Sequence, residues 1–265
     1  MASIGFIGAG RMAEAMIRGL IARGVYPKED IAACAPSEET RKRVSGLGVA
    51  MYESADEVAR LAKVLVLAVK PKHVKGLFED EGLRLGKDHL LISIAAGITI
   101  ETLSSYVPDS RIVRVMPNHC CAVLEGAAGF ARGNATDDDV RLVERIFSAT
   151  GLAEEVREED IDAVTGVSGS SPAFVYMFLK GVVRAGTDAG LTKEAATKLA
   201  AQSLIGAGKM ALEAGMTPEA LVDNVCSPGG TTIEGVKILD SGGFEELVRK
   251  AVAASIERSK EMSGK

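Results

Sequence analysis

The sequence is poor in the residues that build disulfide frameworks and metal centres. It contains no tryptophan, 4% aromatic residues, three histidines and four cysteines without Cys-x-x-Cys spacing. So few cysteines in a chain of 265 residues predict no disulfide framework and favour a reducing compartment. His119-Cys120-Cys121 has no second cluster with which to complete a tetrahedral site. We therefore expect a cytoplasmic protein without a metal, with His119 in a loop and with His73 and His89 at the surface.

Long apolar runs and an excess of positive charge are also absent. The most apolar helical stretch, Ala173–Leu179, is stopped by Lys180 and Arg184, well short of the roughly 20 apolar residues that a membrane span requires. The N-terminus lacks the basic region, apolar run and cleavage site of a signal peptide, so none is predicted. The formal net charge is -5, and the basic residues are mixed with acidic ones. We expect neither a membrane nor a nucleic acid as partner.

The first part of the chain alternates short apolar runs with amphipathic stretches. The runs that predict strands are Ile4–Ile7, Ile31–Cys34, Val64–Val69, Leu90–Ile94 and Ile112–Met116. Helical periodicity lies between them, for example in Arg11–Arg23, Glu38–Leu47 and Ile100–Tyr106. Near-continuous apolar strands separated by helices indicate a parallel sheet covered on both faces. Residues 1–161 are thus predicted to form a doubly wound α/β domain.

The strand pattern ends near Ile161, and residues 162–265 are predicted to form a separate, all-helical domain. The expected helices are Ala163–Gly190, Lys193–Ala214, Pro218–Val225, Thr231–Leu239 and Phe244–Met262. They are apolar around more of their circumference than a small domain can hide, and their small residues allow close helix contacts. This pattern predicts a homo-oligomer assembled through these helices.

Glycines follow the first predicted strand immediately and open a helix. Gly8 would allow the tight turn, Gly10 would let the backbone approach a pyrophosphate, and Ala13 would take the place of the third glycine at the helix–strand contact. A pyrophosphate would lie at the helix N-terminus, where free N–H groups favour anions. The spacing predicts a dinucleotide site, with a plain structural turn as the alternative.

The end of the second predicted strand bears on the choice of cofactor. NAD sites usually place a carboxylate there, but this strand runs into Cys34-Ala35-Pro36-Ser37. Arg41, Lys42 and Arg43 follow and could face a 2′-phosphate, although each could equally belong to a solvated helix face. We therefore expect NADPH as cofactor, with NADH as the alternative.

Two further loops follow predicted strands. Val64–Val69 runs into Lys70-Pro71, and Leu90–Ile94 runs into Ala95-Ala96-Gly97. Ligands bind outside the carboxyl ends of the strands in such sheets, so these loops are expected beside the cofactor. Simple strand termination is the alternative for both.

A Ser-Pro-Gly-Gly turn from Ser227 to Gly230 precedes a predicted helix that begins with Thr231 and Thr232. Successive backbone N–H groups and three hydroxyls converge there, which suits a small carboxylate. An ordinary capped helix is the alternative, but two consecutive glycines with three hydroxyls exceed what a cap needs.

Together these segments resemble the pyrroline-5-carboxylate reductase family over nearly the whole chain. The resemblance rests on Gly5–Gly10, Ala68–Pro71, Ala95–Gly97, Arg114–Asn118, Asp162–Gly166, Ser168–Ala173 and Ser227–Ile233. It implies a Rossmann-like N-terminal domain, a helical C-terminal domain that dimerises, and hydride transfer from NADPH to the cyclic imine 1-pyrroline-5-carboxylate, which gives proline. Larger assemblies such as a decamer are also implied. The sequence departs from the family pattern at Cys34-Ala35, Ala55, His119-Cys120, Ser171 and Phe174.

The resemblance also implies roles for individual residues. Ser227, Gly229, Gly230 and Thr231 would bind the substrate, and Thr232 would hydrogen-bond the ring nitrogen as the catalytic residue. Asn224 would lie near the nicotinamide. The remaining cofactor contacts would be Ile7, Gly8, Ala9, Gly10, Arg11, Met12, Pro36, Ser37, Ala68, Val69, Lys70, Pro71, Ile94, Ala95 and Ala96.

Three other functions compete with this interpretation. A β-hydroxyacid dehydrogenase would carry a catalytic Lys with an Asn four residues later, but Lys180 is followed at that spacing by Arg184. Another imine reductase or a non-catalytic NADPH-binding protein would keep the fold. The intact segment from Ser227 to Thr232 argues against a non-catalytic protein.

Overall fold

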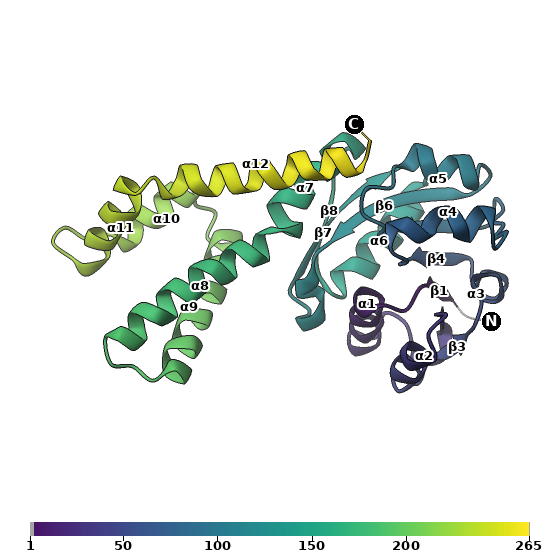
Figure 1. The fold of residues 1–265 in the computed structure, drawn as a ribbon, viewed down its shortest axis with the longest axis horizontal. Helices are drawn as coiled ribbons and strands as arrows, with labels where there is room; N and C mark the ends of the chain where they lie inside the picture. The colour runs from purple at the N-terminus through teal and green to yellow at the C-terminus, as the bar shows by residue number, and fades with distance from the viewer. Residues whose placement is uncertain (1–2, 265) are drawn as a thin grey trace. The chain divides into compact units, whose positions relative to one another are not determined.

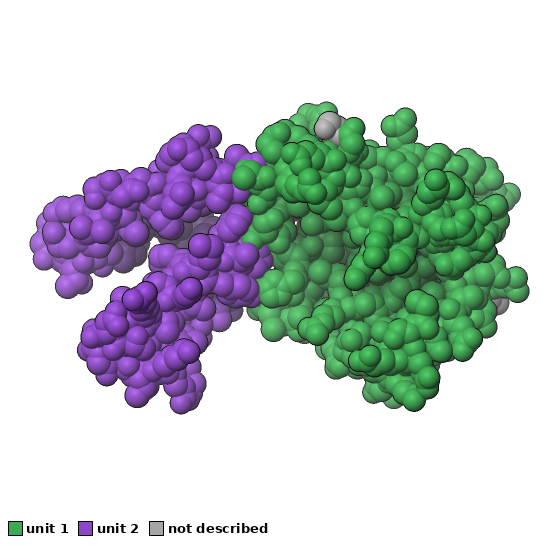
Figure 2. Space-filling model, in the orientation of Figure 1, with its two compact units in different colours: residues 1–170, 254–265 green, residues 171–253 purple. Residues whose placement is uncertain are grey.

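The computed structural model describes residues 3–264, which divide into two compact units (Figure 2). The sheet unit runs to Ser170 and includes the chain from Ala254 onward, and the helical unit is Ser171–Ala253. The domain boundary that the sequence suggests between residues 161 and 162 stays a prediction.

The described part of the sheet unit contains an eight-stranded sheet in the order β3-β2-β1-β4-β5-β6-β7-β8 (Figure 1). Neighbouring strands are parallel except β6 and β7. The strands are β1 (Ile4–Ile7), β2 (Ile31–Cys34), β3 (Ala50–Tyr52), β4 (Val64–Leu67), β5 (Leu90–Ser93), β6 (Arg111–Pro117), β7 (Gly126–Arg132) and β8 (Gly151–Glu155). The predicted α/β sheet is thereby confirmed.

Three strands were not expected from the sequence, each for a physical reason. β3 is a short edge strand without a fully buried residue, and β8 is mostly exposed, so neither shows an apolar run. β7 consists largely of Ala and Gly, which lack the branched and aromatic side chains that mark strands. β4 and β5 also end earlier than predicted, at Leu67 and Ser93.

Helices cover both faces of the sheet, because side chains alternate along each strand. Phe6 and Val66 belong to one buried cluster, which the helices α1, α2 and α6 cover, while Ile7 and Leu65 belong to the other, under α3, α4 and α5. The helices are α1 (Arg11–Ala22), α2 (Glu38–Ser45), α3 (Ala55–Leu61), α4 (Pro71–Glu79), α5 (Ile100–Tyr106) and α6 (Asp137–Ser148). The sheet is therefore doubly wound, as predicted.

The long helix predicted from Ala163 to Gly190 is interrupted near its start. α7 (Ile161–Val164) leads into a π-helical stretch at Thr165–Gly169, here called the π segment, and α8 (Ser171–Asp188) follows. The hydroxyls of Thr165 and Ser168 donate to the carbonyls of Ile161 and Val164, each four residues earlier, at 3.0 Å. Such bonds compete with regular helix geometry, and helical periodicity does not reveal them.

The helical unit contains α8, α9 (Lys193–Glu213), α10 (Pro218–Val225), α11 (Thr231–Ser241) and the first part of α12 (Phe244–Met262). Of residues 171–253, only Ala196 and Ala200 are buried. Large apolar side chains such as Met177 and Leu212 are 73% and 75% exposed. A single copy of the chain therefore gives this unit almost no core of its own. None of the helices within residues 3–264 combines the length and hydropathy that a bilayer crossing requires.

A buried ion pair fastens β6 to the chain that precedes α7. The Arg114 side chain is 3% exposed, and its Nη1 lies 3.2 Å from Glu158 Oε1. The same carboxylate oxygen accepts the backbone N–H of Ile100 at 2.6 Å, at the start of α5. One carboxylate thus satisfies a buried guanidinium and a helix N-terminus together.

We predict that Glu158→Ala destabilises the protein, because it leaves Arg114 buried without its counter-ion. Loss of a hydrogen bond to a charged group costs about 1.5–3 kcal/mol. Urea unfolding at equal protein concentration measures the change, and Glu159→Ala is the matched control, since the ion pair of Glu159 is with the exposed Arg157. Equal unfolding midpoints for both variants would contradict the assigned role of Glu158.

Candidate active site

Hydrogen bonds join the four strand ends at the carboxyl edge of the sheet. Gly8 N–H donates to Cys34 O at 3.1 Å, Ala68 N–H to Ile7 O at 2.8 Å, and Ile94 N–H to Leu67 O at 3.1 Å. The structure therefore brings the loops after β1, β2, β4 and β5 together. Ligands of open α/β sheets bind at this edge.

The two glycines of the first loop have different surroundings. Gly8 has φ +95°, and a Cβ there would lie 2.9 Å from the Ala68 carbonyl carbon and oxygen, so the turn excludes a side chain. Gly10 is the N-cap of α1, and a Cβ there would meet no atom of the described chain within 4 Å. Ala13 is fully buried in the core, as its predicted helix–strand contact requires. The glycine pattern thus leaves open space at a helix N-terminus, which favours anions.

Two arginines from α2 fasten these loops. Arg41 Nη1 donates to the carbonyls of Ala35 at 2.8 Å and Pro36 at 2.9 Å. Arg43 Nη2 donates to Ala9 O at 3.3 Å, and its Nε lies 2.9 Å from a Glu14 oxygen. These positions are therefore more than a solvated helix face, which the sequence pattern had left open.

The other residues near the end of β2 are exposed. Ser37 is the N-cap of α2, and its hydroxyl oxygen accepts the backbone N–H of Thr40 at 3.4 Å. Lys42 forms an exposed ion pair with Glu38 at 2.8 Å. Both Pro36 and Ser37 lie open to a ligand.

The loops after β4 and β5 complete the edge. Lys70 is the exposed N-cap of α4, and Pro71 occupies the first helical position, where its missing N–H costs nothing. Ala68, Val69, Ile94 and Ala96 are partly exposed, and Ala95 is buried. Ala96 and Gly97 line a cavity of about 350 Å³, which is also bordered by Thr165, Ser170, Ala254, Ser255, Arg258, Ser259 and Met262.

Two of the four cysteines, Cys34 and Cys121, are buried thiols. Burial raises the pKa of the Cys34 thiol, an effect that the Gly8 N–H partly offsets, and burial likewise raises the pKa of the Cys121 thiol. A protonated thiol is a poor nucleophile and a poor metal ligand. Within residues 3–264 no three His, Cys, Asp or Glu side chains are grouped so that they could hold a metal ion.

The segment expected to bind substrate belongs to the helical unit, whereas the residues of the carboxyl edge belong to the sheet unit. Gly229 has φ +73°, Gly230 N–H donates to Ser227 O at 3.0 Å, and a Cβ at Gly230 would lie 2.5 Å from Ser227 Oγ. Among the described residues no side chain caps α11, which begins at Thr231 after Gly230. The first N–H groups of this helix therefore receive no hydrogen bond from a capping side chain, and such a helix N-terminus favours an anion. Asn224 is exposed near the end of α10.

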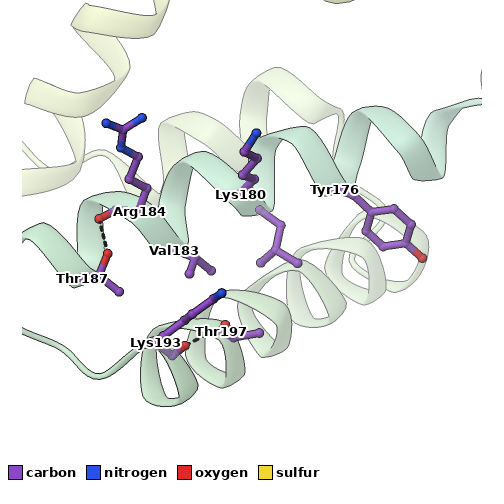
Figure 3. Close-up of a pocket in the computed structure, with 8 residues that line it drawn as sticks. Tyr176, Lys180, Val183, Arg184, Thr187, Lys193 and Thr197 are labelled. Carbon is purple, nitrogen blue, oxygen red and sulfur yellow. Dashed lines mark hydrogen bonds between the residues drawn. The ribbon is translucent and has the colours of Figure 1, made fainter.

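A groove between α8 and α9 carries the position that the rival dehydrogenase would use (Figure 3). Lys180 and Arg184 project from the same side of α8 one turn apart, and Lys193 lies on α9 (Figure 3). An Asn at position 184 would offer an amide carbonyl beside Lys180, but the guanidinium offers donors only. The groove contains none of the site residues that the sequence suggested.

Two residues differ from or add to the sequence-based expectations. His89 is 9% exposed, so the surface prediction was wrong. Its Nδ1 accepts Gly86 N–H at 3.0 Å, which leaves Nε2–H to donate to Ala59 O at 3.1 Å.

Asn118, after β6, is 8% exposed and bonds to backbone groups of three segments. Only the family resemblance drew attention to it, because its partners are distant in sequence.

Known proteins match both parts of the chain. Residues 158–262 match the family "Pyrroline-5-carboxylate reductase dimerisation", and residues 3–97 match "NADP oxidoreductase coenzyme F420-dependent". A pyrroline-5-carboxylate reductase of Pisum sativum is 38% identical, over 98% of this chain and 96% of that protein. Pyrroline-5-carboxylate reductase 2 of Homo sapiens is 40% identical, over 98% of this chain and 83% of that protein.

Solved structures agree with these matches. A pyrroline-5-carboxylate reductase of Coxiella burnetii has a TM-score of 0.91 at 37% identity, covering 99% of this chain and 98% of that one. The Plasmodium falciparum pyrroline carboxylate reductase with NADP bound has a TM-score of 0.84 at 31% identity, with the same coverage of 99% and 98%. Sequence and fold agree over nearly the full length, and this chain belongs to the pyrroline-5-carboxylate reductase family.

Proposed function

We propose that this enzyme transfers a hydride from NADPH to 1-pyrroline-5-carboxylate and so forms L-proline, the last step of proline biosynthesis. The observation that carries the proposal is the identity of 38–40% to named pyrroline-5-carboxylate reductases over 98% of the chain. Oxidation of NADPH by purified protein and the cyclic imine, followed at 340 nm, tests it. No oxidation above the imine-free control would overturn the proposal.

The carboxyl edge of the sheet holds the cofactor in this proposal. The residues at this edge are Ile7, Gly8, Ala9, Gly10, Arg11, Met12, Pro36, Ser37, Ala68, Val69, Lys70, Pro71, Ile94, Ala95 and Ala96. Asn224, on α10 of the helical unit, is the further cofactor residue of the proposal. The open N-terminus of α1 at Gly10 suits a pyrophosphate, and Arg41 and Arg43 place positive charge near the end of β2. NADPH is preferred because that strand end lacks a carboxylate. NADH serves as a weaker alternative.

Substrate binds at the start of α11. The N–H groups and hydroxyls of Ser227, Gly229, Gly230 and Thr231 hold its carboxylate, because an uncapped helix N-terminus favours an anion. Thr232 is the catalytic residue, since its hydroxyl orients the ring nitrogen and helps to deliver a proton, directly or through water.

The proposed hydride transfer requires little from the side chains beyond positioning the two reactants. When bound, NADPH supplies the hydride, and a protonated imine accepts it readily. The main task of the chain is to hold the two reactants in register, so no strong general acid is required beside the hydroxyl cluster.

Residues 1–161 form the cofactor domain in this proposal, and residues 162–265 form the domain that binds substrate and dimerises. A partner copy supplies the core that residues 171–253 lack. Dimers can combine further, up to a decamer. A chain with four cysteines and no predicted disulfide framework fits the reducing cytoplasm as the place of action.

We predict that Thr232→Ala lowers turnover with the imine and leaves NADPH affinity nearly unchanged. Loss of one oriented hydrogen bond to a charged reacting group costs roughly 1.5–3 kcal/mol, or about ten- to a hundredfold in rate. Thr232→Ser keeps the hydroxyl and should recover most of the activity. Steady-state kinetics with both substrates gives the answer, and unchanged turnover in the alanine variant would remove Thr232 from the mechanism.

We predict that catalytic efficiency is higher with NADPH than with NADH. Replacing Arg41 and Arg43 together by Ala should lower the ratio of the two efficiencies, NADPH over NADH, about tenfold, because a charge-assisted phosphate contact is lost. If the two substitutions only loosened the loops, the efficiencies with both cofactors would fall equally. The measurement is therefore the ratio of the two efficiencies. Arg60→Ala on α3, an exposed arginine paired with Asp56, is the charge control. A wild-type preference for NADH would refute the assignment.

We predict that the active particle has at least twice the mass of one chain, because exposed residues such as Met177 and Leu212 need a cover. Light scattering at assay concentration, combined with activity across the same elution peak, measures this. A fully active particle with the mass of one chain would contradict the prediction.

A further inference from the structure

Asn118 joins three segments with one side chain. Its Oδ1 accepts the backbone N–H of Cys120 at 3.1 Å and of Ala127 at 3.2 Å. Its Nδ2 donates to Ser168 O at 3.1 Å, within the π segment. The side chain lies beyond the carboxyl end of β6, which runs parallel to β5, so it lies at the same edge of the sheet as the cofactor loops. A buried amide satisfied in this way fixes its neighbours, because an unpaired polar group would be costly.

The π segment departs from regular α-helical hydrogen bonding. Ser170 N–H donates to Thr165 O at 2.8 Å, a bond that spans five residues in place of four. Such turns are rare and occur frequently at functional sites. The segment also packs on β6, since a Cβ at Gly169 would lie 3.1 Å from Met116 Cε. The Asn118 amide therefore adds a polar restraint to an apolar contact.

The first residue of the π segment and the residue that follows the segment border the proposed cofactor site. Thr165 and Ser170 line the same cavity of about 350 Å³ as Ala96 and Gly97. Any shift of the segment changes the shape of this cavity. The loops at Gly8 and Pro36, which hold the other end of the dinucleotide in the proposed function, do not take part in these contacts.

We propose that Asn118 is a positioning residue for hydride transfer. It anchors the π segment so that Thr165 and Ser170 keep their places beside Ala96. It acts through that segment and not by contact with either reactant. The proposal rests on the proposed function, because Ala96 belongs to the cofactor site only there.

Asn118→Asp is the sharpest test, because it is nearly isosteric. It keeps an oxygen for Cys120 and Ala127 but replaces the donor to Ser168 O with a carboxylate oxygen, which that carbonyl repels. We expect kcat to fall about tenfold or more at neutral pH. The KM for NADPH should stay within about twofold, because the adenosine and pyrophosphate contacts are not altered.

The same variant offers a pH-dependent rescue. A protonated aspartic acid can again donate to Ser168 O, so the ratio of variant to wild-type kcat should rise as the pH falls. The titratable and charged neighbours Arg114, His119, Cys120, Cys121 and Glu125 are common to both proteins, so the ratio removes their contribution. A purely structural defect gives no such rise.

Asn134→Asp is the matched control at the opposite end of β6. Asn134 Oδ1 accepts Ile112 N–H at 2.9 Å, and its Nδ2 donates to Ser110 O at 3.0 Å, so the variant loses the same kind of bond away from the carboxyl edge. Its kcat should stay near that of the wild type. An equal loss of kcat in both variants would overturn the proposal, as would a full kcat in Asn118→Asp.

Gly169→Ala is the second variant, for the case that Asn118→Asp does not fold. Its added methyl would lie 3.1 Å from Met116 Cε, so it alters the contact between β6 and the π segment while Asn118 stays intact, and kcat should fall with little change in the KM for NADPH. Unchanged kcat there would overturn the proposal. A wild-type enzyme inactive on the imine would overturn the proposed function as well, whereas an active wild type with fully active variants would refute only the role of Asn118.

Discussion

The shared parallel register of β1, β2, β4 and β5 is the constraint from which the rest of the sheet unit follows. Parallel pairing puts every carboxyl end at one edge, and backbone bonds such as Gly8 N–H to Cys34 O then hold adjacent loops together. Loops far apart in the sequence become one surface without help from side chains. Gly8 must be glycine because its close approach to Ala68 leaves no room for a Cβ.

Side chains reinforce this edge in a second step. Arg43 bridges α2 to the Ala9 carbonyl, and Arg41 holds the carbonyls that follow β2. In the proposed function the same two arginines also supply the positive charge that faces a 2′-phosphate. Their replacement would then change both loop stability and cofactor preference, and only the ratio of the catalytic efficiencies with the two cofactors separates these effects.

The helical unit follows the opposite principle. The chain buries almost none of residues 171–253 in a single copy, so its stability depends on association. The segment proposed to bind substrate lies in this unit, at the start of α11. In the proposed function, catalytic geometry and assembly are therefore linked, and monomers are not expected to retain a finished site. Within the sheet unit, β6 holds the chain that precedes Ser170, through Arg114 near its middle and Asn118 beyond its end.

The sequence by itself determined the features that depend on local pattern. Apolar runs identified the five strands that are buried on both faces, and Gly8 marked a turn that leaves no room for a side chain. The ligand contacts that the sequence suggests for Gly8, Gly10 and the turn before Thr231 stay predictions. β7 could not be found, because its Ala and Gly residues become a strand only when β6 and β8 pair with it. The burial of His89 and the partners of Asn118 in β7 and the π segment also depended on tertiary contacts. In each of these cases the deciding hydrogen bond or packing contact joins residues whose local sequence carries no sign of the partner, so only the folded chain could reveal them.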